Sequence, residues 1–161
     1  MKYPSVTTLL AWARRSVLLA ASLAATAPTW AQISLSNTAD LAFGGFVASS
    51  GGTVTVAPNG GRSKGGSVLL VAQGASAAAA QFTVSGTDGA TYAITLPVND
   101  LVTLTDGSHT MAVNNFTSSP SATGTLAGGS QLLRVGATLT AGNAQTPGSY
   151  TGSFAVFVNY N

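Results

Sequence analysis

The chain has 161 residues, no cysteine, and only six basic and four acidic side chains. Charged residues make up 6% of the sequence, far below the roughly 25% of an average soluble domain, so the surface must consist largely of small uncharged residues. Without cysteine the protein cannot form disulfides, and its stability must come from an apolar core.

Residues 1–31 have the pattern of a signal peptide. Three basic residues precede an apolar run over residues 17–27, which is too short to span a bilayer, and Thr29-Trp30-Ala31 places small residues at the two positions that signal peptidase reads. We expect cleavage after Ala31 and export to the periplasm, the outer cell surface or the medium. An uncleaved membrane anchor is the alternative.

The remaining residues, 32–161, are enough for a single domain with one core. They carry three basic side chains and four aspartates, a net charge of −1, so the basic balance of the full chain belongs to its leader. We therefore expect no basic surface for nucleic acid or anionic lipid. No later apolar run is long enough to cross a membrane once the signal is cleaved.

Beyond residue 31, short runs rich in β-branched and aromatic residues alternate with turn residues at intervals of roughly 8 to 12 residues. This spacing is typical of an antiparallel sandwich and predicts an immunoglobulin-like all-β fold. The expected strands span residues 41–47, 53–57, 68–73, 81–85, 91–96, 101–105, 110–116, 132–140 and 150–161.

The residues between these strands refine the prediction. Asp88-Gly89 and Asp106-Gly107 each separate two strands, so two hairpins are expected. The apolar run 68–73 predicts a central strand, while the glycine-rich stretch 60–67 predicts a flexible, exposed connection. Only residues 75–80 have a composition that would allow a short helix.

The last strand has the most regular pattern in the chain. From residue 150 onward, large apolar residues alternate with small or polar ones, which is the period of two that a strand imposes on its faces. We expect the apolar face to pack on the core and the strand to end the chain inside a sheet. This face consists of Tyr150, Gly152, Phe154, Val156, Val158 and Tyr160.

No pattern in the chain predicts a catalytic residue, a cofactor or a metal site. His109 is the only histidine, and the adjacent serine cannot fold back on it as a nucleophile, so we interpret it as a solvated turn residue. A calcium site around Asp100 and Asp106 would need a ligand spacing that the sequence lacks. The stretch 60–67 mixes glycines with lysine and serine, but not in the order of a phosphate-binding loop. An enzyme is therefore the least favoured class of function.

Several short segments resemble a family of secreted bacterial proteins, the domain of unknown function 4402, over nearly all of residues 32–161. The C-terminus is also similar to subunits of chaperone–usher pili and to the spore coat protein U domain. Those subunits carry a glycine fourteenth from the end and a penultimate tyrosine, which here are Gly148 and Tyr160. The other segments that carry the resemblance are Leu41-Ala42-Phe43-Gly44, Gly51-Gly52-Thr53-Val54-Thr55-Val56, Phe82-Thr83-Val84-Ser85-Gly86, Asn114-Asn115-Phe116 and Pro147-Gly148-Ser149-Tyr150-Thr151-Gly152.

This resemblance implies a structural or adhesive surface protein whose sandwich is completed by a strand from another molecule. The C-terminal strand would then pair with another copy of the chain or with a periplasmic assembly chaperone. Ile33 and Leu35, which alternate with serines, would belong to the donated strand. Two alternatives stay open: residues 32–36 could complete the chain's own sheet, and the protein could be a monomeric module that binds a glycan or a protein through its loops.

Overall fold

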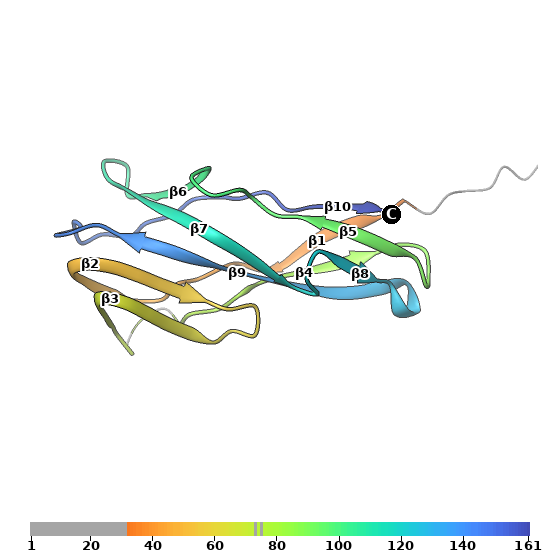
Figure 1. The fold of residues 1–161 in the computed structure, drawn as a ribbon, viewed down its shortest axis with the longest axis horizontal. Helices are drawn as coiled ribbons and strands as arrows, with labels where there is room; N and C mark the ends of the chain where they lie inside the picture. Colours follow the sequence, from red (N-terminus) through yellow and green to blue (C-terminus); the bar gives the residue numbers. More distant parts are fainter. Residues whose placement is uncertain (1–31, 73, 75) are drawn as a thin grey trace, which may run out of the picture. The chain divides into compact units, whose positions relative to one another are not determined.

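The computed structural model describes residues 32–72, 74 and 76–161 (Figure 1). The expected signal peptide and its cleavage point therefore lie outside the described residues. The described part is built of strands joined by turns and one short 3-10 turn, Ala127–Gly129, which confirms the predicted all-β sandwich. The strands are β1 (Ser34–Ala39), β2 (Phe46–Val56), β3 (Arg62–Leu70), β4 (Ala80–Ser85), β5 (Thr91–Thr95), β6 (Val102–Thr105), β7 (Thr110–Ser119), β8 (Thr123–Thr125), β9 (Ser130–Ala141) and β10 (Phe157–Tyr160).

The long strand β9 connects most of the larger sheet. Its first half pairs with β4, its second half pairs with β2 on the same edge, and β7 pairs with its other edge. The sheet runs in the order β1-β4-β9-β2-β3, and β7 and β6 are joined to it through β9. Every second residue of β9 from Leu133 to Ala141 is buried, as expected of a strand with one face on the core.

A second sheet of three strands runs in the order β10-β5-β8. Its central residue is Tyr92 of β5, which is fully buried in one apolar cluster with Val84, Leu126, Leu133 and Val135. The Tyr92 hydroxyl donates a hydrogen bond of 2.8 Å to a side-chain oxygen of Gln131, and burial raises the pKa of Tyr92. The two sheets are therefore joined by apolar contacts around one aromatic ring.

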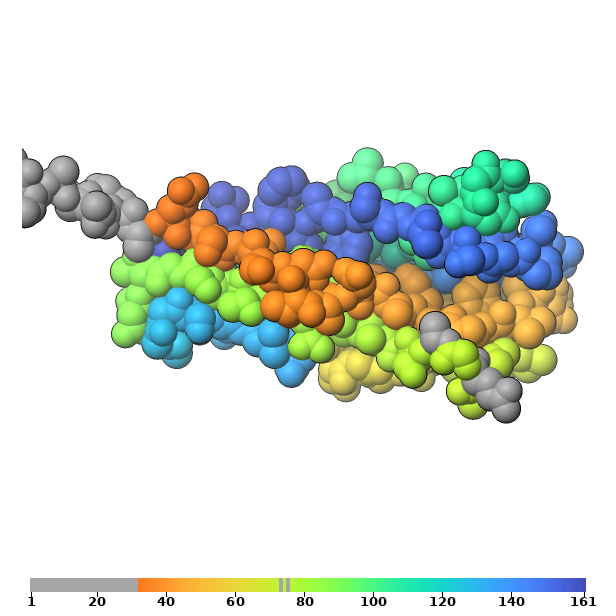
Figure 2. Space-filling model, turned by 180° about the vertical axis from the view of Figure 1, so that it is seen from behind, coloured from red at the N-terminus to blue at the C-terminus, as the bar shows by residue number. Residues whose placement is uncertain are grey.

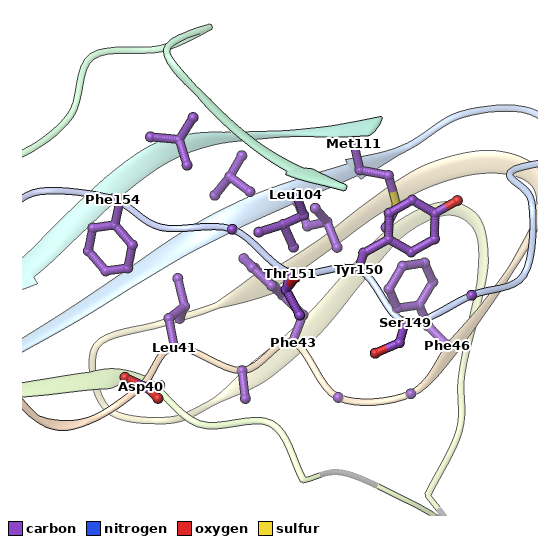
Figure 3. Close-up of a pocket in the computed structure, with 18 of the residues that line it drawn as sticks. Asp40, Leu41, Phe43, Phe46, Leu104, Met111, Ser149, Tyr150, Thr151 and Phe154 are labelled. Atoms are coloured by element: carbon purple, nitrogen blue, oxygen red, sulfur yellow. The ribbon is translucent and has the colours of Figure 1, made fainter. Parts of the chain in front are cut away.

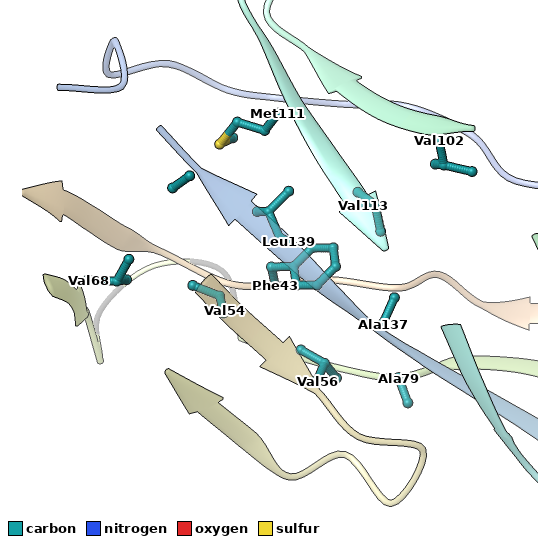
Figure 4. Packing of buried hydrophobic residues seen from close by; sticks show 11 residues of the cluster. Phe43, Val54, Val56, Val68, Ala79, Val102, Met111, Val113, Ala137 and Leu139 are labelled. Carbon is teal, nitrogen blue, oxygen red and sulfur yellow. The ribbon is translucent and has the colours of Figure 1, made fainter. Parts of the chain in front are cut away.

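A second apolar cluster fills the other half of the core (Figure 4). It brings together buried side chains from β2, β3, β6, β7 and β9, and Phe43 from the chain between β1 and β2. Phe43 lies outside any ladder, and its burial helps to fix this connection to the core. The buried members are Phe43, Val54, Val56, Val68, Ala79, Val102, Met111, Val113, Ala137, Leu139 and Ala141.

The β2–β3 ribbon folds back on itself partway along its length (Figure 1). Pairing breaks after Ala48 and resumes at Gly52, where Gly52 faces Gly66. Gly51, Gly52 and Gly66 have positive φ angles, and a Cβ at Gly52 would overlap the carbonyl oxygen of Gly65. Glycines on both strands thus permit a sharp bend that larger residues would block.

Arg62 holds the folded ribbon together. In a straight strand, Arg62 would lie about 30 Å from Val71, far beyond the reach of its side chain. Its guanidinium nevertheless approaches the carbonyl oxygens of Gly45, at 2.7 Å, and of Val71, at 3.5 Å. The bend therefore brings the two ends of β3 close to the start of β2.

The glycine-rich stretch differs from its prediction. Residues 60–67 are not a flexible connection, because β3 begins at Arg62 and its glycines serve the bend. The run 68–73 is not a central strand either, because β3 lies at the edge of the sheet. Of its described residues, 68–72, only Val68 is buried, while Leu69 and Leu70 are exposed. The apolar composition of this run predicted buried side chains, but an edge strand leaves most of them exposed.

Three further expectations can be compared with the structure. β4 and β5 flank Asp88-Gly89 but belong to different sheets, so this turn joins two layers and is not a hairpin. Residues 41–47 do not form one strand, because Ala42 bridges to Ala78 before β2 begins at Phe46. The described residues of the stretch 75–80 contain this bridge and no helix.

The β6–β7 hairpin around Asp106-Gly107 is confirmed. One Asp106 carboxylate oxygen accepts hydrogen bonds from the backbone N–H groups of His109, at 2.7 Å, and Ser108, at 2.8 Å. The other oxygen lies 3.1 Å from Nδ1 of His109. These donors favour the ionised carboxylate, the backbone N–H of His109 most strongly, and hold the pKa of Asp106 well below its usual range.

A substitution in β9 tests the packing of this strand. A Cβ at Gly136 would overlap the carbonyl oxygen of Val56, and backbone atoms cannot yield as a side chain can. We expect Gly136→Ala to lower the free energy of unfolding by about 1–3 kcal/mol, measured by urea denaturation. Gly148→Ala is the matched control, since its Cβ would meet side-chain atoms and no backbone, those of Asp106 at 3.3 Å and of Tyr150 at 3.5 Å. Equal stability of the two variants would contradict the packing around β9.

The Asp106 turn predicts a pH dependence. Because the pKa of Asp106 is lower in the folded chain than the ordinary value of about 3.9, its ionised form stabilises the fold above that value, and this contribution is lost as the pH falls through the folded pKa. We expect Asp106→Asn to lower the thermal midpoint at pH 7, and the difference from wild type to shrink below pH of about 4. A difference that grows on acidification would contradict this assignment.

Candidate functional site

Two chain segments from near opposite ends of the described chain lie side by side (Figure 2), and both line an open groove. Residues 40–48 form one side, which we call the N-terminal wall, and residues 145–154 form the other, the C-terminal wall. The groove has a volume of about 950 Å³. Among the described residues, no backbone hydrogen bond joins the two walls, and the bond from the N–H of Ala144 to the carbonyl of Ser49, at 3.3 Å, lies just beyond both of them.

The floor of the groove is apolar. It is made of Val102 and Leu104 from β6, Met111 and Val113 from β7, and Leu139 from β9. Most of these side chains belong to the buried cluster, and Leu104 packs against it. Figure 3 draws Leu104 and Met111 among the residues that line the groove, so an occupant of the groove would lie directly on the core.

The N-terminal wall is an extended segment paired on one side only. Both the N–H and the carbonyl of Ala42 bond to Ala78, at 2.8 Å each. Because successive residues of an extended chain direct their backbone groups to opposite sides, those of Leu41 and Phe43 face the groove. No described residue bonds the backbone groups of Leu41 or Phe43.

The C-terminal wall has the same design. The N–H of Thr151 donates to Thr105 at 2.9 Å, and the carbonyl of Thr151 accepts from Thr105 at 2.8 Å. The backbone groups of Tyr150 and Gly152 therefore face the groove, and within the described part of the chain no partner bonds them. Each wall thus presents alternate unpaired amides across the groove from the other.

Two aromatic residues anchor the C-terminal wall. The Tyr150 hydroxyl donates to the carbonyl of Thr146 at 2.8 Å and accepts from the side-chain amide of Gln145 at 2.9 Å. Phe154 packs between Phe116, with ring centroids 5.1 Å apart, and Phe82, at 6.4 Å. In Figure 3, Tyr150 and Phe154 of this wall lie across the groove from the side chains of the N-terminal wall.

This arrangement can bind an extended peptide. Unpaired amides on both walls can hydrogen-bond the main chain of a strand placed between them, and the apolar floor can bury every second side chain of that strand. The described residues contain no group of three or more histidine, aspartate or glutamate side chains that could hold a metal. His109 is exposed, as expected of a turn residue, and its Nδ1 lies 3.1 Å from a carboxylate oxygen of Asp106.

The structure separates the predicted strand-pairing residues into two groups. Tyr150 and Phe154 belong to the C-terminal wall, and Gly148 lines the groove where the wall passes the Asp106 turn. The remaining residues lie beyond the groove, against the cluster around Tyr92 or at the edge of it. They are Ile33, Leu35, Val156, Val158 and Tyr160.

The C-terminal strand is shorter than predicted. Only Phe157–Tyr160 pairs continuously with β5, and Thr151 makes a single bridge before it. The predicted apolar face is confirmed for Tyr150, Phe154, Val156 and Val158, which pack against the core clusters, whereas Tyr160 at its end is exposed. The Tyr160 ring lies over Gly86, and its hydroxyl accepts a 2.7 Å hydrogen bond from the N–H of Thr87.

Two features of the site were not predicted. Leu41 and Phe43 were expected in an ordinary strand, and their role as a half-paired wall appears only when the sheet order is known. Arg62, expected in a flexible loop, reaches the carbonyl oxygen of Gly45 in this wall. The sequence signal for the wall is the pair Gly44-Gly45 between two phenylalanines, which interrupts an otherwise apolar strand.

Comparisons with known proteins place this fold in a family. Residues 33–160 match the family model described as "Domain of unknown function (DUF4402)". The comparisons with curated proteins and with solved structures gave no match. In the described part of the chain there is no helix with the length and apolar character needed to cross a membrane. Because the family model covers most of the sequence, the chain belongs to the family of domain of unknown function 4402.

Proposed function

We propose that this chain is a non-enzymatic, exported surface protein of fimbrial-subunit type, with a structural or adhesive role, which assembles by accepting a strand from another molecule into its groove. The donor is a second copy of the chain or, during export, a periplasmic assembly chaperone. The proposal assigns no catalytic step, cofactor or nucleic acid to the protein.

One observation carries this proposal: the groove combines unpaired backbone groups on both walls with an apolar floor. Exposed edges with free N–H and carbonyl groups are a liability that monomeric β proteins normally cover. Here the two edges face each other over the core, so a single inserted strand would pair with both. Among the described residues that line the groove, Asp40 alone is charged, which further supports a contact with a largely uncharged strand.

A monomeric binding module is the second candidate. It is favoured by the position of β1, which pairs with β4 of the same chain and places Leu35 opposite Val84. In this arrangement residues 34–39 complete the chain's own sheet and are not extended toward a neighbour. Such a module would use the groove or its loops to hold a glycan or a protein without forming a polymer.

Export can be tested directly. Cells expressing the full chain should release, on osmotic shock, a protein whose N-terminal sequence begins at Gln32, because the pattern before Ala31 fits a signal peptidase site. Edman sequencing of the released protein gives the answer. Recovery of the whole protein from the cytoplasmic fraction with Met1 or Lys2 at its start would contradict export.

Strand binding can be tested with a variant that fills the groove. Leu104→Trp places a large side chain on the groove floor, whereas Thr103→Trp changes a neighbouring residue of β6 that is exposed. A synthetic peptide of alternating valine and threonine serves as the probe, and calorimetry measures its affinity. We expect Leu104→Trp to weaken binding at least about tenfold, a change of about 1.4 kcal/mol, and Thr103→Trp to leave it unchanged.

Thermal melts of both variants establish that each is folded. Binding of the valine–threonine peptide that survives Leu104→Trp in a folded protein would place the peptide outside the groove. Absence of binding to the wild-type chain would remove the strand-acceptor function.

A further inference from the structure

We infer that the groove is pre-organised: the free chain holds both walls apart without an occupant, and Arg62 is the residue that positions the N-terminal wall. This inference rests on the proposed function, because a groove that is already formed is useful only to a protein that accepts a strand. The claim that both walls are held in place concerns the free chain and can be tested without any ligand.

The N-terminal wall depends on the guanidinium of Arg62. The carbonyl of Gly45 accepts from this guanidinium at 2.7 Å and from the N–H of Val71 at 3.0 Å. A carbonyl has two lone pairs, so this one is fully used and its direction is fixed. The neighbouring Gly44 has a positive φ of 68°, so the wall would otherwise have the freedom of two consecutive glycines.

The environment of Arg62 supports a positioning role. Its Nε is buried and has no hydrogen-bond partner among the described residues, although both terminal nitrogens approach carbonyl oxygens. Leaving a charged donor unsatisfied is unfavourable, so the side chain is held in this pose by the contacts that its terminal nitrogens make. Arginine suits the position because its planar fork can reach two acceptors at once, which the single ammonium of lysine cannot do.

The C-terminal wall is held by contacts on the side away from the groove. Thr151 bonds Thr105 through both backbone groups. Gly152 lies so close to β6 that a Cβ would overlap the carbonyl oxygen of Thr103. Together with the aromatic contacts of Phe154, these interactions fix the wall against β6 and the core.

Pre-organisation has a consequence for binding. An occupant would not have to order either wall, so its association would lose less conformational entropy than binding to a collapsed or mobile groove. The free chain should also fold as a stable domain without a partner strand. A subunit with a pre-organised groove is therefore folded before it binds its partner strand.

Amide hydrogen exchange, followed by NMR, tests the inference on the folded protein purified after expression of the full chain. The amides of Ala42, Val71 and Thr151 donate to backbone carbonyls and should be protected. The amides of Leu41, Phe43, Tyr150 and Gly152 face the groove and should exchange fast. Equal exchange in the two sets would overturn the inference, because the walls would then not be held in the free chain.

Two variants isolate the contribution of Arg62. In Arg62→Lys, we expect the protection of Val71 relative to Thr151 to fall about tenfold, which corresponds to the loss of about one hydrogen bond. Lys64→Met removes an exposed cation from the same strand and should leave this ratio unchanged. A ratio that stays constant in Arg62→Lys would refute the positioning role, and it would do so even if the variant is less stable overall.

The same spectra distinguish this inference from the proposed function. Addition of the valine–threonine peptide should slow exchange at Leu41 and Gly152 if the groove accepts a strand. Protected walls together with unchanged exchange at these two amides would support pre-organisation and count against strand binding. Fast exchange throughout both walls in the free chain, followed by protection on addition of peptide, would support strand binding and overturn pre-organisation.

Discussion

The pairing of β9 on both of its edges is the constraint on which the rest of the structure depends. This strand bonds β4 and β2 along one edge and β7 along the other, so three segments distant in sequence meet on it. Its buried face supplies residues to both apolar clusters, Leu133 and Val135 to one and Ala137, Leu139 and Ala141 to the other. Gly136 lets the backbone at Val56 approach closely.

The groove exists because β9 does not pair with either wall. The C-terminal wall pairs with β6 at a single bridge, and the N-terminal wall pairs with Ala78 at another, so neither wall has a strand on its second side. Both lie over the floor that β6, β7 and β9 provide. A sandwich with one gap in its edge therefore presents backbone groups and apolar side chains in the same place, which is the combination that an incoming strand requires.

Local pattern was enough for most of the fold, and the failures have physical causes. The alternation from Tyr150 to Val158 correctly predicts the face that packs on the core, because a period of two depends only on the chain's own geometry. The run 68–73 was assigned to a central strand since its residues are apolar, but position in a sheet depends on partners far along the chain. The hairpin predicted at Asp88-Gly89 is wrong for the same reason, since β4 and β5 pair with distant strands in different sheets.

The site was only half predictable. Tyr150 and Phe154 stand out by periodicity, whereas Leu41 and Phe43 gain their role from the absence of a neighbour, which no local pattern encodes. Arg62 was assigned to a loop because glycines surround it, and these glycines instead fold the ribbon and carry the guanidinium to Gly45. The most direct measurement of the central claim is an isotope-edited NMR spectrum of the chain with the valine–threonine peptide. The account predicts contacts from the peptide backbone to both Leu41 and Gly152; contacts confined to another surface, such as the exposed edge of β3, would contradict it.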